Sequence, residues 1–190
     1  MAQTVDPTVL IAEDEPDLAD LYTAWLEEDY EVRTAYNGSQ ALDSIDEHVD
    51  VVLLDRRMPG LSGDRVLDTI RDRELDCRVA MVTAVEPDFD IIEMVFDDYL
   101  VKPASSDELR TMVDQLLLRS EYDGMLQEFY ALASKKAILD KQKPDYELRA
   151  SEEYVRLEDR LAVLRSDIDD TMAKLSDRDA YDRACQDIAR

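Results

Sequence analysis

The sequence predicts an α/β fold, in which a doubly wound, five-stranded parallel sheet is followed by an all-α helical hairpin. Short apolar runs alternate with helical patterns as far as residue 104, and beyond it every periodic pattern is helical. A chain of 190 residues also has room for one ordinary domain and a smaller element. We therefore expect a sheet domain at residues 1–120 and a helical domain at residues 121–190.

The strands of the sheet are expected at residues 8–12, 30–34, 49–54, 78–82 and 98–101. The runs near Val51 and Val79 are apolar on both faces, which is typical of buried parallel strands. Helices should lie between the strands, because apolar residues recur there at helical spacing. The first stripe comprises Leu18, Leu21, Tyr22, Trp25 and Leu26, the second Ala41, Leu42 and Ile45, and the third Val66, Leu67 and Ile70.

The hairpin is predicted from two long apolar stripes that Lys143-Pro144-Asp145 separates. Proline interrupts a helix, so two amphipathic helices should fold back antiparallel. Such a pair buries little surface alone, and we expect it to dock on the sheet domain or on a second copy. The first stripe holds Leu118, Tyr122, Met125, Phe129, Leu132 and Leu139, and the second holds Tyr154, Leu157, Leu161, Leu164, Ile168, Met172 and Leu175.

The composition argues against several classes of protein. With only 4 glycines, the chain has neither a phosphate-binding P-loop nor the dinucleotide fingerprint. It has no apolar run of membrane-spanning length and no signal-like amino terminus, which predicts a cytoplasmic protein without a membrane partner. Cys77 and Cys185 have no paired spacing, and His48 stands alone, so a disulfide framework or a zinc site is not expected.

The net charge of −24 comes from acidic residues that are spread along the chain. In molar salt the screening length falls to roughly 3 Å, so dispersed carboxylates repel one another little. They also keep the surface hydrated. We therefore predict a salt-adapted, halophilic protein. The alternative is an ordinary acidic protein, and a folding titration against KCl would distinguish the two.

Reactive side chains stand at the ends of four predicted strands. Glu13 and Asp14 follow the first strand, Asp55 the third, Thr83 the fourth and Lys102 the fifth. The carboxyl ends of parallel strands meet at one edge of a sheet, so we expect these side chains to converge. The three carboxylates suit Mg²⁺, and Asp55 could act as the nucleophile that forms an aspartyl phosphate. Lys102 and Thr83 would then contact phosphoryl oxygens.

Each of these residues also has a simpler interpretation when it is taken alone. Glu13 and Asp14 could cap the first helix, a role that acidic residues often have. Lys102 could be a surface lysine at a turn, and Thr83 an ordinary residue at the end of a strand. Tyr99 could only pack against the edge of the sheet. The phosphoacceptor hypothesis depends on the residues occurring together.

Taken together, the first 120 residues resemble the receiver domain of two-component response regulators. The matching motifs are Glu13-Asp14, Asp55 with Met58-Pro59-Gly60, Thr83-Ala84 and Tyr99-Leu100-Val101-Lys102-Pro103. The resemblance implies that Asp55 accepts a phosphoryl group from a histidine kinase. It also implies that Glu13, Asp14 and the backbone carbonyl of Arg57 hold Mg²⁺ beside Asp55, and that Thr83 and Tyr99 form a switch pair. Such a protein is not an enzyme beyond its own phosphorylation and dephosphorylation.

Two features depart from the usual receiver pattern. The segment at residues 86–96 is short and lacks the usual pair of small residues before the fifth strand, so the fourth helix should be stunted and the signalling face altered. Arg57 and Val85 stand two positions beyond Asp55 and Thr83, where similar receivers tune dephosphorylation. We hypothesise that the bulky Arg57 slows attack by water.

The tail resembles the HalX domain found behind receivers in halophilic archaea, through Phe129-Tyr130-Ala131-Leu132-Ala133-Ser134-Lys135-Lys136. This resemblance implies regulation without a mechanism. Lys135, Lys136, Lys141 and Lys143 gather at the end of the first hairpin helix, where they could contact DNA phosphates. No DNA-binding motif is visible, however, and a solvated helix end with favourable cations is the simpler interpretation.

We therefore predict a response regulator of a two-component phosphorelay. Its helical domain would signal to a partner or through self-association as a homodimer. The alternative is a DNA-binding transcriptional regulator controlled by the same phosphorylation, which a salt-dependent mobility-shift assay would separate. A small-molecule phosphatase resembling the haloacid dehalogenases is a third interpretation. It would need a second Asp two residues after Asp55, where this chain has Arg57.

Overall fold

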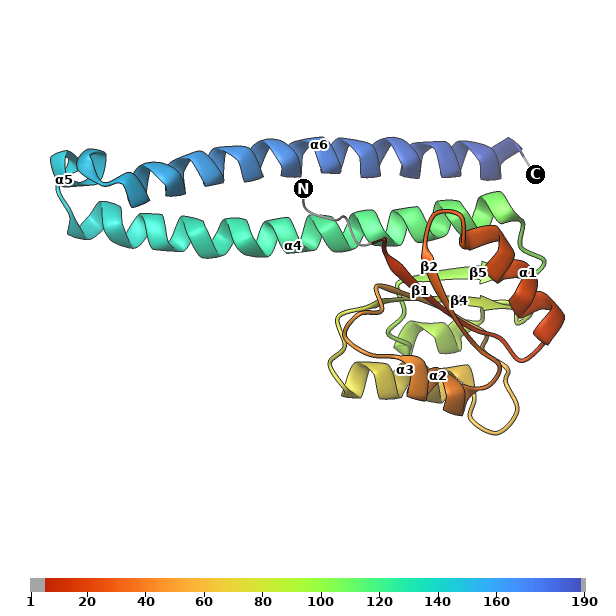
Figure 1. The fold of residues 1–190 in the computed structure, drawn as a ribbon. Helices are drawn as coiled ribbons and strands as arrows, with labels where there is room; N and C mark the ends of the chain where they lie inside the picture. Colours follow the sequence, from red (N-terminus) through yellow and green to blue (C-terminus); the bar gives the residue numbers. More distant parts are fainter. Residues whose placement is uncertain (1–5, 189–190) are drawn as a thin grey trace. The chain divides into compact units, whose positions relative to one another are not determined.

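The computed structural model describes the backbone of residues 6–188 and the side chains of residues 6–176. The chain divides into two compact units, Met1–Leu117 and Leu118–Arg190. The first unit holds the sheet, and the second is a helical hairpin (Figure 1). Helix α4 (Ser106–Gln142) is continuous across the division, so the predicted limit at residue 120 falls inside a helix. The domain limits stay a prediction.

The first unit is built on a five-stranded parallel sheet with the strand order β2-β1-β3-β4-β5. The central strands β1 and β3 are buried along their whole length, as strands covered on both faces are. The predicted parallel sheet is confirmed, and the strand ends agree with the prediction to within two residues. The strands are β1 (Thr8–Ala12), β2 (Glu31–Ala35), β3 (Val51–Leu54), β4 (Arg78–Thr83) and β5 (Asp98–Val101).

Helices cover both faces of this sheet, which confirms the doubly wound fold (Figure 1). On one face, α1 (Pro16–Leu26) and the first turns of α4 pack Tyr22, Leu26, Leu109 and Leu116 against the sheet. On the other face lie α2 (Gly38–Ser44) and α3 (Gly63–Asp72). Helix α1 begins at a proline, which suits the first turn of a helix. Helix α2 begins after Asn37, whose side chain accepts a hydrogen bond from the Gln40 amide at 2.9 Å.

The connection between β4 and β5 holds only η1 (Phe89–Glu93), a single short 3-10 helix. This agrees with the expectation that the fourth helix is stunted. Arg71 of α3 anchors the end of the connection, because its guanidinium donates to the Val95 carbonyl at 2.8 Å and to the Asp97 carboxylate at 2.8 Å. Asp97 also accepts a hydrogen bond from Arg78 at 3.0 Å. The short connection is therefore held by charge pairs and not by a packed helix.

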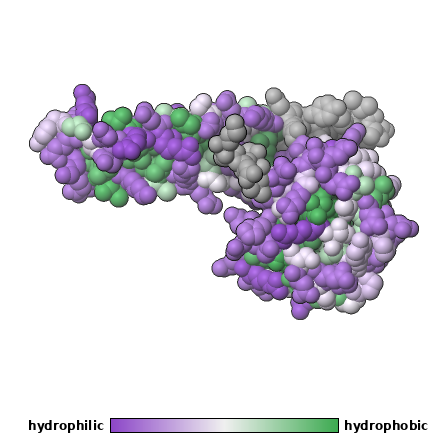
Figure 2. Space-filling view, in the orientation of Figure 1, coloured by the Kyte–Doolittle hydropathy of each residue, from purple (hydrophilic) through white to green (hydrophobic). Residues whose placement is uncertain are grey.

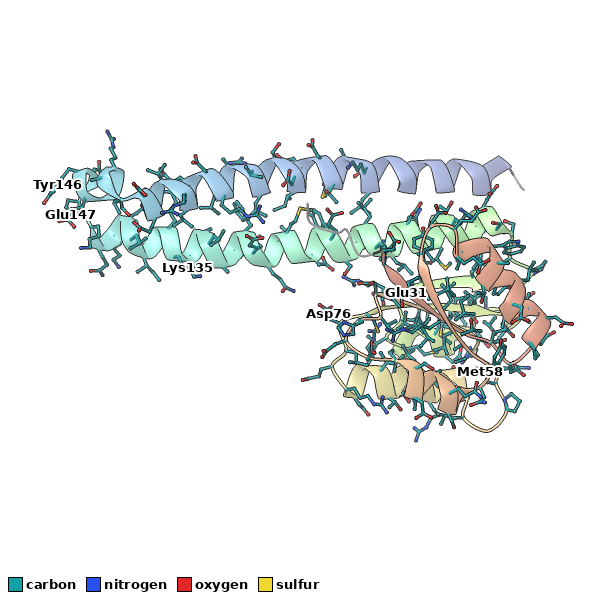
Figure 3. All side chains as sticks on the ribbon, in the orientation of Figure 1. Glu31, Met58, Asp76, Lys135, Tyr146 and Glu147 are labelled. Carbon is teal, nitrogen blue, oxygen red and sulfur yellow. The ribbon has the colours of Figure 1, made fainter. Side chains whose placement is uncertain are left out.

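The second unit pairs the later part of α4 with α6 (Glu152–Ile188). Helix α4 ends at Gln142, just before Pro144, and the turn contains a short helix that was not predicted, α5 (Asp145–Ala150). Tyr146 and Glu147 lie on this turn, while Lys135 lies on α4 (Figure 3). The predicted hairpin is confirmed. Most of the visible surface of the chain is hydrophilic, and hydrophobic side chains gather along the hairpin (Figure 2).

The residues of α6 that face its partner recur in a seven-residue pattern, which is typical of a coiled-coil seam. They are Tyr154, Leu157, Leu161, Leu164, Ile168, Thr171 and Leu175, all buried or half-buried. Met172 was expected in this stripe, but it is 53% exposed, whereas Thr171 is buried. Met172 lies at the edge of the seam, where its sulfur accepts a hydrogen bond from the Tyr122 hydroxyl of α4 at 3.2 Å. The buried position goes to Thr171 because the seam follows a strict heptad, and Thr171 stands seven residues after Leu164.

A polar cluster near the turn sets the register of the hairpin. Lys136 occupies a position of the α4 stripe, and its ammonium lies 2.5 Å from the Tyr154 hydroxyl and 3.2 Å from the Glu158 carboxylate. Asp140 binds both Lys136 and Tyr154. A polar residue at a seam position specifies register because a shifted pairing would leave it without partners. Further along, Arg160 donates to Glu128 at 2.8 and 2.7 Å.

Some remaining expectations concern single residues. Leu21 was expected to face the core of the first unit, but it is 43% exposed, because α1 turns Ala19, Tyr22 and Leu26 toward the sheet instead. Cys77 is a buried free thiol, and burial raises its pKa to about 11. Cys185 lies outside the described side chains. Among the described residues, no helix has the length and apolar character needed to cross a membrane.

Candidate functional site

The predicted site residues converge at the carboxyl edge of the sheet. Glu13 and Asp14 directly follow β1, Asp55 follows β3, Thr83 ends β4, and Lys102 follows β5. The register places these ends side by side, because Ala12 pairs with Leu54 and Thr83 pairs with Val101. The sheet hydrogen bonds continue one step further into the loops. The Asp55 amide donates to the Ala12 carbonyl at 2.9 Å, and the Lys102 amide donates to the Thr83 carbonyl at 2.8 Å.

Lys102 joins the two most buried carboxylates of the site. Its ammonium donates to an oxygen of Asp55 at 2.6 Å and to an oxygen of Glu13 at 2.6 Å. The three side chains are only 10%, 8% and 2% exposed. Burial lowers the pKa of Lys102, but its hydrogen bonds to the two carboxylates outweigh this effect and raise the pKa above its ordinary value. Burial also raises the pKa of Glu13, and the ammonium offsets this only in part.

Glu13, Asp14 and Asp55 form a cluster of carboxylate oxygens that could hold a metal ion. One oxygen from each residue lies within 4.8 Å of the others. All the donors are hard oxygen atoms from acidic side chains, and Asp14 is half-buried, so water could complete the coordination. The chemistry of this donor set fits Mg²⁺, which takes few protein carboxylates and keeps several waters. The second oxygen of Asp55 accepts a hydrogen bond from the Arg57 amide at 3.0 Å.

Thr83 and Tyr99 are connected through Val85. The Thr83 side chain is fully buried, and its hydroxyl accepts a hydrogen bond from the Val85 amide at 3.3 Å. The Tyr99 hydroxyl donates to the Val85 carbonyl at 2.7 Å, and its ring packs against Phe96 with the centroids 5.5 Å apart. A movement of the Thr83 hydroxyl would therefore break a hydrogen bond of Val85, the residue that binds the Tyr99 hydroxyl.

An open pocket of about 390 Å³ lies over Asp55. Asp14, Asp55, Thr83 and Lys102 contribute to its lining, together with Arg57. The Arg57 side chain is exposed, and it also lines a neighbouring pocket of about 520 Å³. All seven residues predicted for the site thus lie in this region, with Glu13 buried beneath the pocket and Tyr99 beside it. The structure brings the predicted set together.

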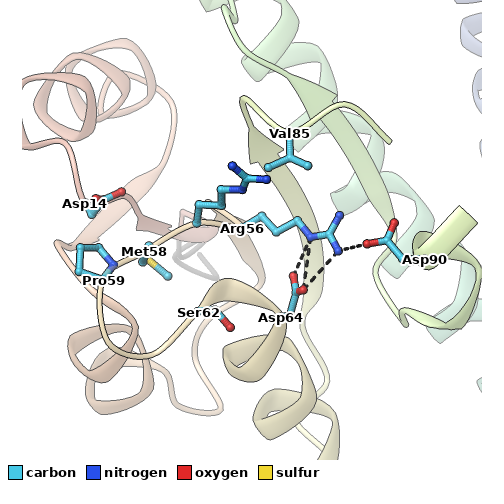
Figure 4. A pocket seen from close by; sticks show the side chains of 9 residues that line it. Asp14, Arg56, Met58, Pro59, Ser62, Asp64, Val85 and Asp90 are labelled. Atoms are coloured by element: carbon cyan, nitrogen blue, oxygen red, sulfur yellow. Dashed lines mark hydrogen bonds and ion pairs between the residues drawn. The ribbon is translucent and has the colours of Figure 1, made fainter. Parts of the chain in front are cut away.

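The sequence analysis missed an ion-pair network next to Asp55. Arg56 extends between Asp64 of α3 and Asp90 of η1 (Figure 4). Its guanidinium lies 3.0 Å from Asp64 and also pairs with Asp90. No periodic pattern signals such a network. The one available signal was an arginine directly after Asp55, in a chain rich in carboxylates.

Gly63 is a second feature that the sequence analysis missed. A Cβ atom at this position would lie 2.2 Å from the Asp55 carbonyl oxygen and 2.9 Å from the Arg56 Cα. The Gly63 amide donates to the Arg56 carbonyl at 3.0 Å. The start of α3 therefore presses directly on the loop that carries Asp55, and only glycine leaves enough room.

Comparisons with known proteins agree with this geometry. The family described as "Response regulator receiver domain" matches residues 9–114, and the HalX domain family matches residues 118–185. A protein of Haloferax volcanii named "Putative transcriptional regulator" is 49% identical over 166 residues, which is 87% of this chain and 28% of that protein. The response regulator SaeR of Staphylococcus epidermidis is 34% identical over 58% of this chain and 50% of its own length. The chain spans half or less of the length of these relatives.

Solved structures match the first unit. The response regulator TrrA of Thermotoga maritima, in complex with Mg²⁺ and a beryllium fluoride, is 36% identical, with a TM-score of 0.52 over 58% of this chain and 99% of that one. The receiver domain of the Francisella response regulator 1452 is 30% identical, with a TM-score of 0.54 over 60% of this chain and 98% of that one.

Proposed function

Because this chain belongs to the response regulators of two-component systems, with a receiver domain at residues 9–114, we propose that Asp55 accepts a phosphoryl group from a histidine kinase. The observation that carries this proposal is the ammonium of Lys102, which lies 2.6 Å from Asp55 and 2.6 Å from Glu13. A buried carboxylate beside an ammonium, in a pocket open to solvent, is poised to act as a nucleophile.

The transfer itself follows from the positions of these groups. A carboxylate oxygen of Asp55 attacks the phosphorus of a phosphohistidine and forms a new O–P bond. The N–P bond breaks, and its electron pair returns to the imidazole, which takes up a proton from solvent. Lys102 and Asp55 line the same pocket, so the Lys102 ammonium can turn from Asp55 to the oxygens of a phosphoryl group that enters it. The Thr83 hydroxyl can donate to another phosphoryl oxygen after it gives up its contact with Val85.

We propose that Glu13, Asp14 and Asp55 hold Mg²⁺, with the carbonyl of Arg57 completing the set. The ion, when bound, would reduce the repulsion between these carboxylates and an incoming phosphoryl group. The acidic side chains have their own part in the proposal. They make phosphorylation dependent on a divalent cation, whereas the Lys102 ammonium and the Arg57 amide orient the Asp55 carboxylate.

The phosphorylated state would be transmitted by Thr83 and Tyr99. When the Thr83 hydroxyl moves to the phosphoryl group, the Val85 amide loses its hydrogen bond to Thr83, and only the bond from Tyr99 to the Val85 carbonyl is left between Val85 and these two residues. Tyr99 is then free to leave the Val85 carbonyl and turn inward. A receiver with two conformations shifts toward the one that interacts more favourably with the phosphoryl group. The difference in interaction free energy between the two conformations sets the size of the shift. We propose that the HalX hairpin passes this shift to a partner or to a second copy of the chain.

The experiment for the phosphoacceptor uses acetyl phosphate and Mg²⁺ in concentrated KCl. Intact-mass spectrometry should show one phosphoryl group on the wild-type protein and none on Asp55→Asn. The Asp72→Asn variant is the matched control, because Asp72 is an exposed residue at the end of α3. Labelling that persists in Asp55→Asn, or a wild-type protein that stays unlabelled with Mg²⁺ present, would refute the proposal.

A second candidate output is regulation of transcription through DNA. It is favoured by the name of the relative from Haloferax volcanii and by the lysines near the end of α4, of which Lys135 and Lys141 are exposed. Sizing chromatography and mobility-shift assays, each with and without beryllofluoride, separate the two outputs. Self-association without DNA binding supports the first, and phosphorylation-dependent DNA binding supports the second. Contacts with DNA phosphates would weaken steeply as salt is raised.

A further inference from the structure

Arg56 is the residue next to the proposed phosphoacceptor, and it connects three separate elements of the receiver. Its backbone is in the loop after β3, and its guanidinium binds Asp64 in α3 and Asp90 in η1 (Figure 4). The Arg56 side chain is only 12% exposed, whereas that of Asp90 is 52% exposed. Arg56 is thus the buried partner of the ion pair, and Asp90 is the exposed partner that attaches η1 to it.

The segment that Arg56 holds has little packing of its own. Phe89 is 85% exposed and Ile92 is 77% exposed, so η1 turns its largest apolar side chains outward. No residue of η1 is buried. A segment with few buried apolar contacts opens at low free-energy cost, and in such a segment a single ion pair contributes a large share of the local stability.

A chain of contacts links this ion pair to Thr83. Thr83 accepts a hydrogen bond from the Val85 amide, and the Val85 carbonyl accepts one from the Tyr99 hydroxyl. Val85 in turn lines the same pocket as Arg56, Asp64 and Asp90 (Figure 4). Arg56 therefore lies at the junction of two routes from the phosphorylation site. One is its own backbone beside Asp55, and the other runs through Thr83 and Val85.

We propose that the Arg56–Asp90 ion pair is a latch that holds η1 in the unphosphorylated protein and is released when Asp55 is phosphorylated. This inference rests on the proposed function of Asp55. A phosphoryl group adds up to two negative charges to the residue next to Arg56. The pocket that Arg56 lines also includes Asp14 and Arg57 of the phosphorylation site, so the guanidinium gains a competing anionic partner. The rearrangement of Thr83 and Tyr99 also changes the hydrogen bonds of Val85, which lines the same pocket as Arg56 and Asp90. Release frees η1, with Phe89 and Ile92, to change conformation as the signalling surface.

Hydrogen exchange of the backbone amides of residues 89–94 tests the latch in the full-length protein. In the wild-type protein, beryllofluoride with Mg²⁺ should speed exchange at these amides roughly two- to fivefold, the range expected for loss of a partly exposed ion pair. In Asp90→Asn the same amides should already exchange faster without beryllofluoride. Adding beryllofluoride should then change them no further.

Two controls isolate the ion pair. Glu93→Gln removes one charge from the same segment but leaves Asp90 in place, and it should behave as the wild-type protein does. In the double variant Arg56→Gln/Asp90→Asn, exchange should be no faster than in Arg56→Gln alone, because that substitution already breaks the pair. Independent, multiplied effects of the two substitutions would overturn the latch.

The outcomes also separate the latch from the phosphoacceptor. Fluorine NMR reports whether beryllofluoride binds, and Asp55→Asn shows whether it binds at Asp55. Binding at Asp55 without any change at residues 89–94 would overturn the latch and leave the phosphoacceptor intact. Exchange in Asp90→Asn that matches the wild-type protein without beryllofluoride would overturn the latch independently of the phosphorylation site. Failure of beryllofluoride to bind would overturn both the proposed phosphoacceptor and the latch.

Discussion

The ammonium of Lys102 lies 2.6 Å from a carboxylate oxygen of Glu13, a residue 89 positions earlier in the chain. The same ammonium also binds Asp55, so one cation is shared by two buried carboxylates. This shortage of positive charge explains why burial can raise the pKa of Glu13 although it is paired. A site with an excess of buried carboxylates is costly for the fold, and a divalent cation relieves that cost.

The first prediction concerns Lys102→Met, which removes the shared cation. At pH 7 without Mg²⁺, the free energy of unfolding should fall by about 3 kcal/mol, because the buried carboxylates lose their partner. Mg²⁺ should restore part of this loss. The check is urea unfolding in concentrated KCl, with chelator and with Mg²⁺. Lys141→Met changes an exposed lysine and serves as the control. Equal stability of Lys102→Met and the wild-type protein would contradict the shared-cation interpretation.

The pKa of Lys102 gives this prediction a pH dependence. The pKa is raised above 10.5 in the folded protein, so the stabilisation from Lys102 is fully present below that pH. It is lost as the pH rises through the raised value. The stability difference between the wild-type protein and Lys102→Met should therefore shrink in strongly alkaline solution, where the ammonium loses its proton.

The second prediction concerns Glu13→Gln, which should stabilise the protein in the absence of Mg²⁺. The folded-state pKa of Glu13 is raised above 4.5, so its favourable contribution is present below that pH and is lost as the pH rises through the raised value. Near neutral pH the charged carboxylate destabilises the folded protein, and its removal should add about 1 kcal/mol to the free energy of unfolding. The gain should vanish below pH 4.5, where both proteins carry a neutral side chain.

The same variant should bind Mg²⁺ more weakly, because it loses one of three clustered carboxylates. Thermal unfolding at increasing Mg²⁺ concentration measures both effects. A Glu13→Gln protein that is less stable than the wild-type protein near neutral pH, and equally stabilised by Mg²⁺, would show that Glu13 has only a structural role. Asp72→Asn again provides a control for loss of a single negative charge at the surface.

The third prediction compares Gly63→Ala with Gly124→Ala. A methyl group at position 63 would meet the Asp55 carbonyl oxygen at 2.2 Å, which is backbone and can yield only if the phosphoacceptor loop moves. The substitution should lower the free energy of unfolding by about 1–3 kcal/mol and reduce labelling by acetyl phosphate. Gly124 lies within α4, and a Cβ atom there would meet nothing within 4 Å. Its replacement should add about 1 kcal/mol and leave labelling unchanged.

The fourth prediction concerns Arg57, whose exposed side chain lines the pocket over Asp55. If its bulk hinders the approach of water to the acyl phosphate, Arg57→Asn should shorten the lifetime of the phosphorylated protein. The lifetime is measured by the decay of the phosphorylated mass after acetyl phosphate is removed. Arg65→Asn, on the exposed side of α3, should leave it unchanged. An unaltered lifetime in Arg57→Asn would contradict the steric explanation.

The sequence predicted the sheet and the convergence of the site because both depend on short-range patterns. Apolar runs mark buried strands, and parallel strands must bring their carboxyl ends to one edge, so the sequence places Asp55, Thr83 and Lys102 together. In contrast, the pair between Arg56 and Asp90 depends on the path of the β4–β5 connection. Charged residues on exposed connections have no periodicity that would reveal their partners.

The details of the hairpin show a similar limit. The stripe of α6 was found by its spacing, but hydropathy favoured Met172 over Thr171 for the same seam. The strict heptad decides in favour of Thr171, because helix geometry and not hydropathy determines which side chain faces the partner. The continuity of α4 past residue 120 was also missed, since a helix that ends one unit and begins the next has no capping signal between them.

The last prediction concerns salt. The net charge of −24 causes repulsion between surface carboxylates, and this repulsion destabilises the folded state. Raising KCl from about 0.1 M to 1 M shortens the screening length from roughly 10 Å to 3 Å, which removes most repulsion between surface carboxylates. The free energy of unfolding should therefore rise steeply with KCl. The short pair between Lys102 and Asp55 is buried and should be affected little. Stability measured in Lys102→Met should thus rise with KCl in parallel with the wild-type protein. A wild-type stability that stays flat over this range of KCl would contradict salt adaptation.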